Sequence, residues 1–155
     1  MGVEIERKFL VKGDRWRSLG SSEFYRQGYL TTAQDGCTVR VRLVGDRACV
    51  TIKGRTVGNR RAEFEYAIPA ADAEEMLDTL CQKPLIEKNR YKILSGSLVW
   101  EVDEFMGENA GLIVAEVELS DPQQVIDLPD WVGEEVSGDP RYFNAYLAQQ
   151  PFSQW

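Results

Sequence analysis

Charged and apolar residues alternate along residues 3–10, and this alternation is the feature that most restricts how the chain folds. Successive residues of a β-strand point to opposite faces, so one face of this stretch is charged and the other is largely apolar. The charged face consists of Glu4, Glu6 and Lys8, and the other includes Val3, Ile5 and Phe9. Two interpretations of such a strand are open: its charged face is either the solvated side of an ordinary sheet or the wall of a charged site.

Seven further stretches show the same period of two and are predicted as strands. They cover residues 24–30, 37–44, the Gly45-Asp46 turn to about residue 54, 61–69, 86–94, 98–105 and 112–119. Their polar faces are dominated by paired charges, whereas solvated sheets more often carry Ser, Thr and Gln. Eight antiparallel strands suffice to close a barrel that holds one small ligand. We therefore predict a β-dominated α+β fold: a closed eight-stranded antiparallel β-barrel (tunnel) with a polar charged lumen and helices packed outside.

Helical periodicity is limited to a few segments. Residues 70–80 are predicted as the one long helix, with Asp72 and Glu75 in a capping-box arrangement. A short helical turn is expected over residues 14–19, a short helix after Pro122, and a closing helix over residues 141–149. These helices, or a second subunit in a homodimer, are expected to cover the apolar outer faces. Trp100 and Phe143 are predicted to be core residues.

The composition describes one globular domain over residues 1–155, with 43% hydrophobic and 28% charged residues. The net charge of −7 argues against nucleic acid and membrane surfaces as partners. No membrane-length apolar run and no signal peptide is present, so a cytoplasmic location is expected. Cys37, Cys49 and Cys81 lack the spacing of a disulfide framework or a zinc site. The absence of histidine excludes His-based catalysis, so carboxylates would hold any metal, which favours Mg²⁺ or Mn²⁺.

A lumen lined by both signs of charge suits a compact polyanion. Arginine makes forked contacts to phosphate oxygens, and lysine acts as a point charge. Carboxylates can hold a divalent cation that bridges phosphate oxygens. Phosphoryl transfer needs mainly positioning and charge neutralisation, so the lack of histidine is no obstacle. The charged faces therefore favour a triphosphate group bound together with a divalent cation.

The stretch Glu4-Ile5-Glu6-Arg7-Lys8 resembles the ExExK signature of the CYTH, or triphosphate tunnel metalloenzyme, superfamily. The resemblance covers essentially the whole chain, because the later charged pairs follow the family's order and residues 137–144 are similar to its closing helix. It implies a set of metal ligands: Glu4, Glu6 and Glu118, with Glu116 beside them and Asp103 as a further candidate. It also implies a triphosphate clamp: Lys8, Arg40, Arg42, Lys53, Lys88 and Arg90.

The resemblance leaves the roles of four more residues open. Glu63 and Glu65 either bind a second metal or orient the basic residues. Arg141 either reaches the tunnel from the closing helix or makes a C-terminal salt bridge. Tyr29 either gates the substrate or packs within its strand.

The resemblance implies a hydrolase, and the short chain with compact loops favours inorganic tripolyphosphate as its substrate, cleaved to pyrophosphate and phosphate. A class IV-type adenylate cyclase is the first alternative, but it needs an adenine pocket and a base for the ribose 3′-hydroxyl, and the sequence shows neither. Thiamine triphosphatase is another enzymatic alternative. A polyphosphate-binding module without turnover is the non-enzymatic alternative, although pure anion binding would not need so many carboxylates.

Overall fold

The computed structural model describes residues 2–32 and 36–155. The strands are β1 (Gly2–Val11), β2 (Ser21–Thr32), β3 (Thr38–Val44), β4 (Arg47–Lys53), β5 (Arg60–Ile68), β6 (Ile86–Ser95), β7 (Leu98–Phe105), β8 (Ile113–Glu118) and β9 (Val132–Glu135). The α-helices are α1 (Ala70–Thr79) and α2 (Asn144–Leu147), and the 3₁₀ helices are η1 (Arg15–Ser18), η2 (Gly107–Asn109), η3 (Pro140–Tyr142) and η4 (Phe152–Gln154). The predicted strands and the predicted long helix are all present.

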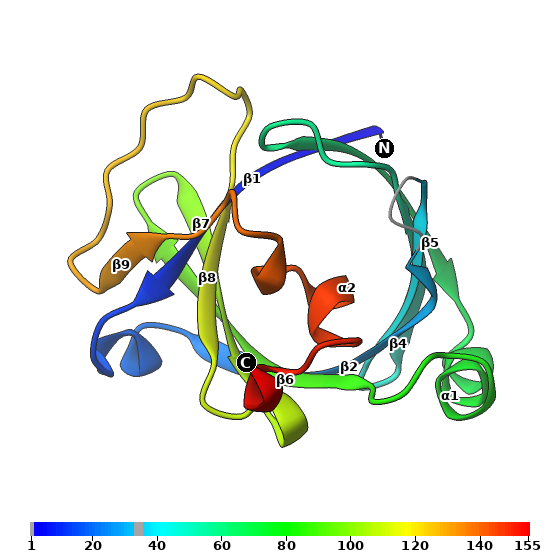
Figure 1. The fold of residues 1–155 in the computed structure, drawn as a ribbon. Helices are drawn as coiled ribbons and strands as arrows, with labels where there is room; N and C mark the ends of the chain where they lie inside the picture. The colour runs from blue at the N-terminus through cyan, green and yellow to red at the C-terminus, as the bar shows by residue number, and fades with distance from the viewer. Residues whose placement is uncertain (1, 33–35) are drawn as a thin grey trace.

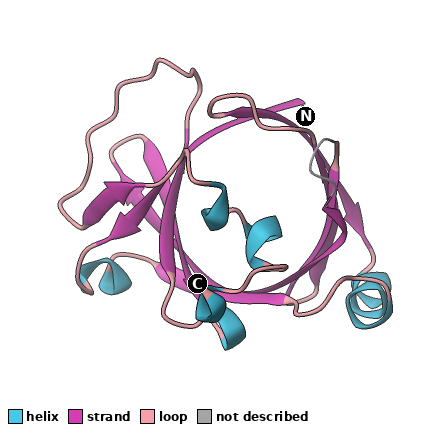
Figure 2. Cartoon of the chain, viewed as in Figure 1, coloured by secondary structure: helices cyan, strands magenta, loops and turns pink. Residues whose placement is uncertain are grey.

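Eight of these strands close into a barrel, which Figures 1 and 2 show end-on. The order around the ring is β5-β4-β3-β2-β6-β7-β8-β1, and every neighbouring pair is antiparallel. The ring closes where β1 returns to β5, through pairs that run from Gly2–Glu63 to Ile5–Arg60. The short strand β9 pairs with β1 outside the ring. The prediction of a closed eight-stranded antiparallel barrel is confirmed.

The strand register brings the charged faces together on the inside of the barrel. Across the β1–β8 pair, Glu6 lies opposite Glu118 and Lys8 lies opposite Glu116. Side chains directly opposite each other in a sheet lie on the same face, so these charges share the lumen. Lys8 is 6% exposed and Lys88 is 1% exposed. These charged faces are therefore not the solvated side of a sheet.

Helix α1 covers the outer apolar face of β3. Ala73 and Leu77 are one helical turn apart, and they pack in one buried cluster with Val41 and Leu43. Because Leu77 is completely buried, truncating it to alanine should cost on the order of 2–5 kcal/mol. This contact anchors the helix that the sequence predicts with the least ambiguity.

A second apolar cluster covers the outer faces of β1, β7 and β8. Trp100 on β7 is completely buried. Its ring centroid lies 5.5 Å from that of Phe9 and 5.6 Å from that of Trp131, in tilted and edge-on arrangements that aromatic pairs favour. Trp16 of η1 belongs to the same cluster. The prediction that Trp100 is a core residue is confirmed.

Helix α2 lies inside the ring of strands, in contrast to α1, which packs outside (Figures 1 and 2), so the prediction that the helices pack outside is wrong for α2. The expected closing helix is divided into η3 and α2, with Phe143 between them. Leu147 of α2 is completely buried and packs with Tyr29, Ile86 and Phe105. The barrel interior therefore has an apolar part beneath α2 and a charged part beside it.

Two further predicted helical features are wrong. Pro69 occupies the N-cap of α1 and provides no side-chain cap, so Asp72 lies in the first turn and forms no capping box. After Pro122 the described chain forms a turn, because the carboxylate of Asp121 accepts the backbone N–H of Gln123 at 2.7 Å. Such local bonds compete with helix formation. Within the described residues, none of the helices is both long and apolar enough to cross a bilayer.

Candidate functional site

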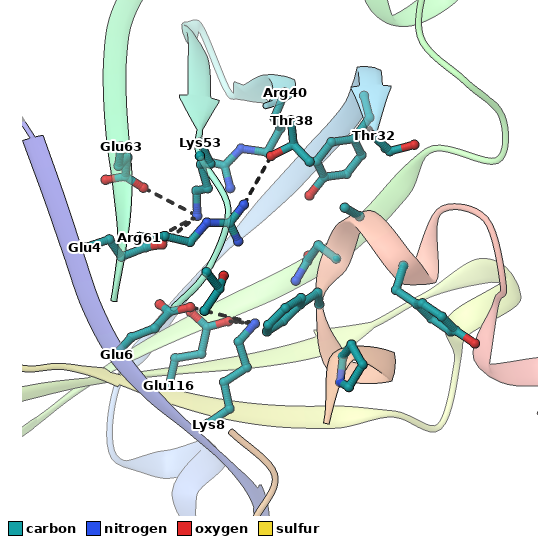
Figure 3. A pocket seen from close by; sticks show the side chains of 18 of the residues that line it. Glu4, Glu6, Lys8, Thr32, Thr38, Arg40, Lys53, Arg61, Glu63 and Glu116 are labelled. Atoms are coloured by element: carbon teal, nitrogen blue, oxygen red, sulfur yellow. Dashed lines mark hydrogen bonds and ion pairs between the residues drawn. The ribbon is translucent and has the colours of Figure 1, made fainter. Parts of the chain in front are cut away.

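A cavity of about 600 Å³ occupies the charged part of the lumen, and Figure 3 shows one side of it. Most of the predicted site residues line this cavity: Glu4, Glu6, Lys8, Tyr29, Arg40, Arg42, Lys53, Glu63, Glu65, Lys88, Arg90, Glu116 and Glu118. Asp103 and Arg141 are not among the lining residues. The barrel thus gathers side chains from distant parts of the sequence around one space.

Lys8 lies between two carboxylates on β1 and β8. Its Nζ is 3.4 Å from Glu116 Oε1 and 3.8 Å from Glu6 Oε1. Burial by itself lowers the pKa of Lys8, but Glu116, Glu6 and Glu4 outweigh burial and raise that pKa. Burial likewise opposes ionisation of Glu116, yet Lys8 and Arg90 hold its pKa well below the usual range. Lys8 and Glu116 therefore form a charged pair inside the barrel.

Two further carboxylates of β1 and β8, those of Glu6 and Glu118, lie close to other carboxylates. Burial raises the pKa of Glu6 to about 8, and the neighbouring Glu116 carboxylate adds to the shift. Burial also raises the pKa of Glu118, followed in importance by the charges of Glu4 and Glu63. A raised carboxyl pKa means that the ionised form is disfavoured where it stands. A bound cation would relieve this repulsion.

Lys53 joins carboxylates at the point where the barrel closes. Its Nζ donates to Glu4 Oε2 at 3.1 Å and lies 3.4 Å from Glu63 Oε2, as the dashed lines in Figure 3 show. Burial and the nearby charge of Arg40 lower the pKa of Lys53, and the carboxylates oppose this shift. Lys53 thus links β4 to both β1 and β5.

Asp103 contacts two cations of β6. Its Oδ2 accepts from Lys88 Nζ at 2.7 Å, and its two oxygens accept from Arg90 at 2.7 and 2.8 Å. Burial opposes the charge of Asp103, but Arg90 and Lys88 prevail and lower its pKa. Burial lowers the pKa of Lys88 to about 7, although Asp103 opposes this shift. With both oxygens engaged, Asp103 is placed to orient Lys88 and Arg90.

Two side-chain amides, the buried Gln27 and the half-buried Asn144, connect β2, β3 and the C-terminal segment. Gln27 Oε1 accepts from Arg42 Nε at 2.9 Å, and Gln27 Nε2 donates to Asn144 Oδ1 at 3.0 Å. Asn144 Oδ1 also accepts from Lys88 Nζ at 2.9 Å. Amides are neutral, so they orient Arg42 and Lys88 without cancelling the positive charge of either. Burial lowers the pKa of Arg42 to about 10, and the nearby charge of Arg40 adds to the shift.

Arg40 is connected to Glu65 through a buried threonine. Its Nη2 donates to Thr51 Oγ1 at 3.1 Å, and the Thr51 hydroxyl donates to Glu65 Oε2 at 3.0 Å. The direct distance from Arg40 Nη2 to Glu65 Oε2 is 3.8 Å. In this structure Glu63 and Glu65 both contact basic side chains, which matches the alternative in which they orient the clamp.

Three predictions about aromatic and C-terminal residues have different outcomes. Arg141 lies outside the cavity and pairs with Asp139 at 2.7 Å, which is the C-terminal salt bridge considered above. Tyr29 lines the cavity and also packs in the apolar cluster beneath α2. The prediction that Phe143 is a core residue is wrong, because Phe143 lines the cavity with Lys8 Nζ 4.9 Å from its ring centroid.

The carboxylates are not arranged as a finished metal centre. The part of the chain that the structure describes contains no group of three or more His, Cys, Asp or Glu side chains placed to hold a metal ion. Lys8 and Lys53 instead lie against the carboxylates. The donor set consists of oxygens in a region of crowded negative charge, which suits a hard divalent cation. The residues therefore fit such an ion once the two ammonium groups turn toward another anion.

Several residues that line the cavity or support its lining were not anticipated from the sequence, among them Gln27, Thr51, Arg61 and Asn144. Arg61 lies at the start of β5, two residues before Glu63, so its position on the lumen face was available from the period of two. Gln27 and Thr51 are neutral, and the charge pattern did not single them out. Asn144 enters the site only through the tertiary position of α2, which the sequence pattern does not show.

The fold and the cavity together define a class of protein: a closed antiparallel tunnel that binds a small, highly charged ligand. Residues 2–143 match the CYTH domain, and the chain belongs to this family.

Two curated relatives named inorganic triphosphatase match almost the whole chain. The relative from Acetivibrio thermocellus is 51% identical over 152 residues, which cover 98% of this chain and 97% of the relative. The relative from Nitrosomonas europaea is 40% identical over 150 residues, which cover 94% of this chain and 97% of the relative. A crystal structure of an inorganic triphosphatase matches with a TM-score of 0.66 and 36% identity, covering 93% of this chain and 96% of that one.

Proposed function

We propose that this chain is a metal-dependent triphosphatase that hydrolyses inorganic tripolyphosphate to pyrophosphate and phosphate inside the barrel. The two relatives named inorganic triphosphatase support this activity. The structural observation that carries the proposal is the crowding of cations around Arg42. Burial, together with the nearby charges of Arg40 and Arg90, lowers the pKa of Arg42 to about 10. A buried polyanion would remove this unfavourable crowding, because buried charges need partners.

In this proposal six basic side chains form the triphosphate clamp: Lys8, Arg40, Arg42, Lys53, Lys88 and Arg90. They come from β1, β3, β4 and β6, so they approach a linear phosphate chain from several sides. Asp103 and Gln27 hold three of these cations in place before any substrate binds. Donors that are already oriented need little reorganisation when charge develops on the phosphate oxygens.

We assign the metal ion, Mg²⁺ or Mn²⁺, to the carboxylates of β1 and β8: Glu4, Glu6, Glu116 and Glu118. When bound there, such an ion would supply Lewis-acid stabilisation of the negative charge on the phosphate group. The raised pKa values of Glu6 and Glu118 support this assignment, because a cation stabilises their ionised forms. Lys8 and Lys53, which now contact Glu116 and Glu4, would turn to the phosphate oxygens.

The proposed reaction is an in-line attack by water on a terminal phosphorus, with pyrophosphate as the leaving group. The clamp holds the chain in one geometry and neutralises the oxygens that gain charge. Positioning and neutralisation of this kind need no histidine and no covalent intermediate. The experiment is a phosphate-release assay with tripolyphosphate, ATP and thiamine triphosphate, each with Mg²⁺ or Mn²⁺ and with a chelator.

We expect release to be fastest from tripolyphosphate and to stop when the metal is chelated. Tight binding of tripolyphosphate without phosphate release would leave a polyphosphate-binding module. Cyclic AMP formed from ATP would make the protein an adenylate cyclase, and fastest release from thiamine triphosphate would reassign the substrate.

We also infer a cytoplasmic protein whose partner is this small polyanion, with no nucleic-acid or membrane partner. All three cysteines are free thiols in the structure, which fits a reducing compartment. The net charge of −7 disfavours binding to polyanionic polymers and anionic surfaces. A homodimer through the outer face of β5, where Tyr66 is 58% exposed, stays a prediction that light scattering can check.

A further inference from the structure

Arg61 is a lumen cation that belongs neither to the assigned metal ligands nor to the six-residue clamp. It follows Arg60 at the start of β5 and lies opposite Glu4 of β1. The period of two places it on the same face as Glu63 and Glu65, and it lines the cavity. Arg61 thus adds a positive charge to a strand whose other lumen charges are carboxylates.

The guanidinium of Arg61 has an incomplete set of partners. Its Nη2 donates to Thr38 Oγ1 at 3.2 Å, a bond that Figure 3 draws across the cavity wall. Its Nε is buried and has no hydrogen-bond partner within the described residues. Arg61 also forms no ion pair within that part of the chain, whereas the neighbouring Lys53 contacts both Glu4 and Glu63.

An arginine in this state is suited to bind an anion. A buried donor without a partner is destabilising, so the arrangement gains free energy when a ligand supplies the missing acceptor. The guanidinium offers five N–H donors in a rigid fork that matches phosphate oxygens. Arg40 on β3 also has a buried Nε without a partner in the described chain. Two buried arginine Nε groups of the barrel therefore lack acceptors within the described residues.

The ring of Phe143 lies near both Arg61 and Lys8, a residue of the proposed clamp. The Cζ of Arg61 lies 5.9 Å from the ring centroid of Phe143, and Lys8 Nζ lies 4.9 Å from the same centroid. The ring of the C-terminal segment thus has two cations near it, and a cation near an aromatic face is stabilised without losing its charge. A phosphate group beside Phe143 would meet both Lys8 and Arg61.

Arg61 also faces Lys88 and Arg90 across the barrel. Along the order β5-β4-β3-β2-β6 there are four steps from β5 to β6, and along β6-β7-β8-β1-β5 there are again four. The two strands therefore stand on opposite walls of the ring. A ligand that contacts both walls has to span the lumen, and a chain of three phosphates reaches farther than a chain of two.

We propose that Arg61 is a further substrate-binding residue that holds the end of the tripolyphosphate chain farthest from Arg90. Arg61 then makes binding depend on chain length, and the product pyrophosphate, held by Lys88 and Arg90, does not reach it. This assignment rests on the proposed function, because it deepens the description of the same site. It predicts that substrate and product, which carry the same chemical groups, are bound with different affinity.

The test is calorimetric titration of the full chain with tripolyphosphate and with pyrophosphate, in the presence of a chelator so that no turnover occurs. The variants are Arg61→Ala and Arg61→Lys, with Arg60→Ala as the matched control, because Arg60 is the adjacent arginine and is exposed. Arg61→Ala should weaken tripolyphosphate binding about 10- to 100-fold, the loss expected for charged hydrogen bonds, and leave pyrophosphate binding unchanged. Arg61→Lys should fall between wild type and Arg61→Ala, and Arg60→Ala should match wild type.

Equal losses for both ligands, or unchanged tripolyphosphate binding in a folded Arg61→Ala variant, would overturn the assignment. Thermal unfolding establishes whether each variant is folded; should Arg61→Ala not fold, Arg61→Lys must still weaken tripolyphosphate binding selectively. Wild-type protein that binds tripolyphosphate through Arg61 but releases no phosphate with Mg²⁺ would overturn the proposed hydrolysis and keep this assignment. If the protein releases phosphate from tripolyphosphate but its binding does not depend on Arg61, the proposed hydrolysis is kept and the assignment of Arg61 is overturned.

Discussion

The ammonium group of Lys88 lies 2.7 Å from the carboxylate of Asp103 inside the barrel, and each side chain is 1% exposed. A buried pair of this kind adds little net stability, because desolvation offsets most of the attraction. Removing one partner nevertheless lowers the stability strongly, because the remaining charge stays buried without a counter-charge. The pair therefore places Asp103 among the residues that we expect to orient the proposed clamp, and not among the proposed metal ligands.

Asp103→Asn should lower the free energy of unfolding by about 3–5 kcal/mol, because it leaves Lys88 and Arg90 as buried cations without their counter-charge. Urea denaturation measures this change. Glu101→Gln is the matched control: Glu101 lies 3.3 Å from the same Arg90, but its side chain is 32% exposed. The control should cost less than about 1 kcal/mol. An Asp103→Asn protein that is as stable as the control, but has lost metal affinity, would make Asp103 a metal ligand instead.

Tripolyphosphate binding should take up protons through Lys88. The pKa of Lys88 is about 7 in the folded chain, below its usual 10.5. Between these values the unfolded chain holds the extra proton, so the contribution of Lys88 to stability rises with pH in this window. A polyanion beside Lys88 favours the ammonium form and raises its pKa again. Near pH 8, wild type should therefore take up more protons on binding than Lys88→Met, by up to about one proton.

Calorimetry in buffers of different ionisation enthalpy counts the protons taken up by the two proteins. The comparison between them removes the contributions of the ligand's own phosphate groups and of the other titrating side chains. The same proton count for wild type and Lys88→Met would contradict the prediction.

Glu6→Gln should abolish metal-dependent phosphate release and leave the fold intact, and Glu4→Gln should have the same effect on release. The folded pKa of Glu6 is about 8, above its usual 4.5, so its contribution to stability falls as the pH rises through this window. The amide removes that cost, and near pH 8 the free energy of unfolding should be no lower than that of wild type.

Glu135→Gln serves as the control for these variants, because Glu135 pairs with Arg7 through β9 and does not line the cavity. Its phosphate release should remain at the wild-type level. Full metal-dependent release by Glu6→Gln would remove Glu6 from the proposed metal site.

Gln27 should act on the substrate through Arg42. Arg42→Ala should weaken tripolyphosphate binding by about 1.5–3 kcal/mol, the range for a charged hydrogen bond. Gln27→Met keeps the size of the side chain and removes the bond to Arg42 Nε, so we expect a smaller loss of about 0.5–1.5 kcal/mol. The double variant should bind no more weakly than Arg42→Ala alone, because the two residues act in one chain of contacts.

Steady-state kinetics with tripolyphosphate gives KM and kcat for these three proteins, and thermal unfolding confirms that they are folded. Unchanged KM and kcat in Arg42→Ala would refute its place in the clamp. Losses that add in the double variant would show that Gln27 acts independently of Arg42.

The barrel was predictable because the period of two recurs over many strands with the same division of residue types. In β1 alone, Glu4, Glu6 and Lys8 fit a solvated strand as well as a lumen wall. The paired charges on the other strands decide the matter, because eight such faces can be gathered inside one closed ring. The same period of two also places Arg61 on the lumen face with Glu63 and Glu65, so the pattern could have identified one more lumen residue than the predicted site contains.

The remaining features depend on contacts that no local pattern carries. Val132–Glu135 is too short to show a period, and it forms β9 because β1 extends past β5 and offers backbone partners on that edge. Phe143 and Asn144 enter the lumen because α2 packs on apolar residues of four different strands. These positions follow from the finished barrel, so they had to be seen in three dimensions.

Because β1 closes the ring by pairing with both β5 and β8, the site is assembled late in folding. During synthesis β1 is made before both of its barrel neighbours, and it waits for β5 and then for β8 before its hydrogen bonds are complete. Pairing between segments so far apart along the chain is intrinsically slow. The acidic and basic side chains of β1 therefore stay in water until most of the polypeptide has left the ribosome. The proposed binding site is therefore assembled only after β8 has been synthesised and has paired with β1.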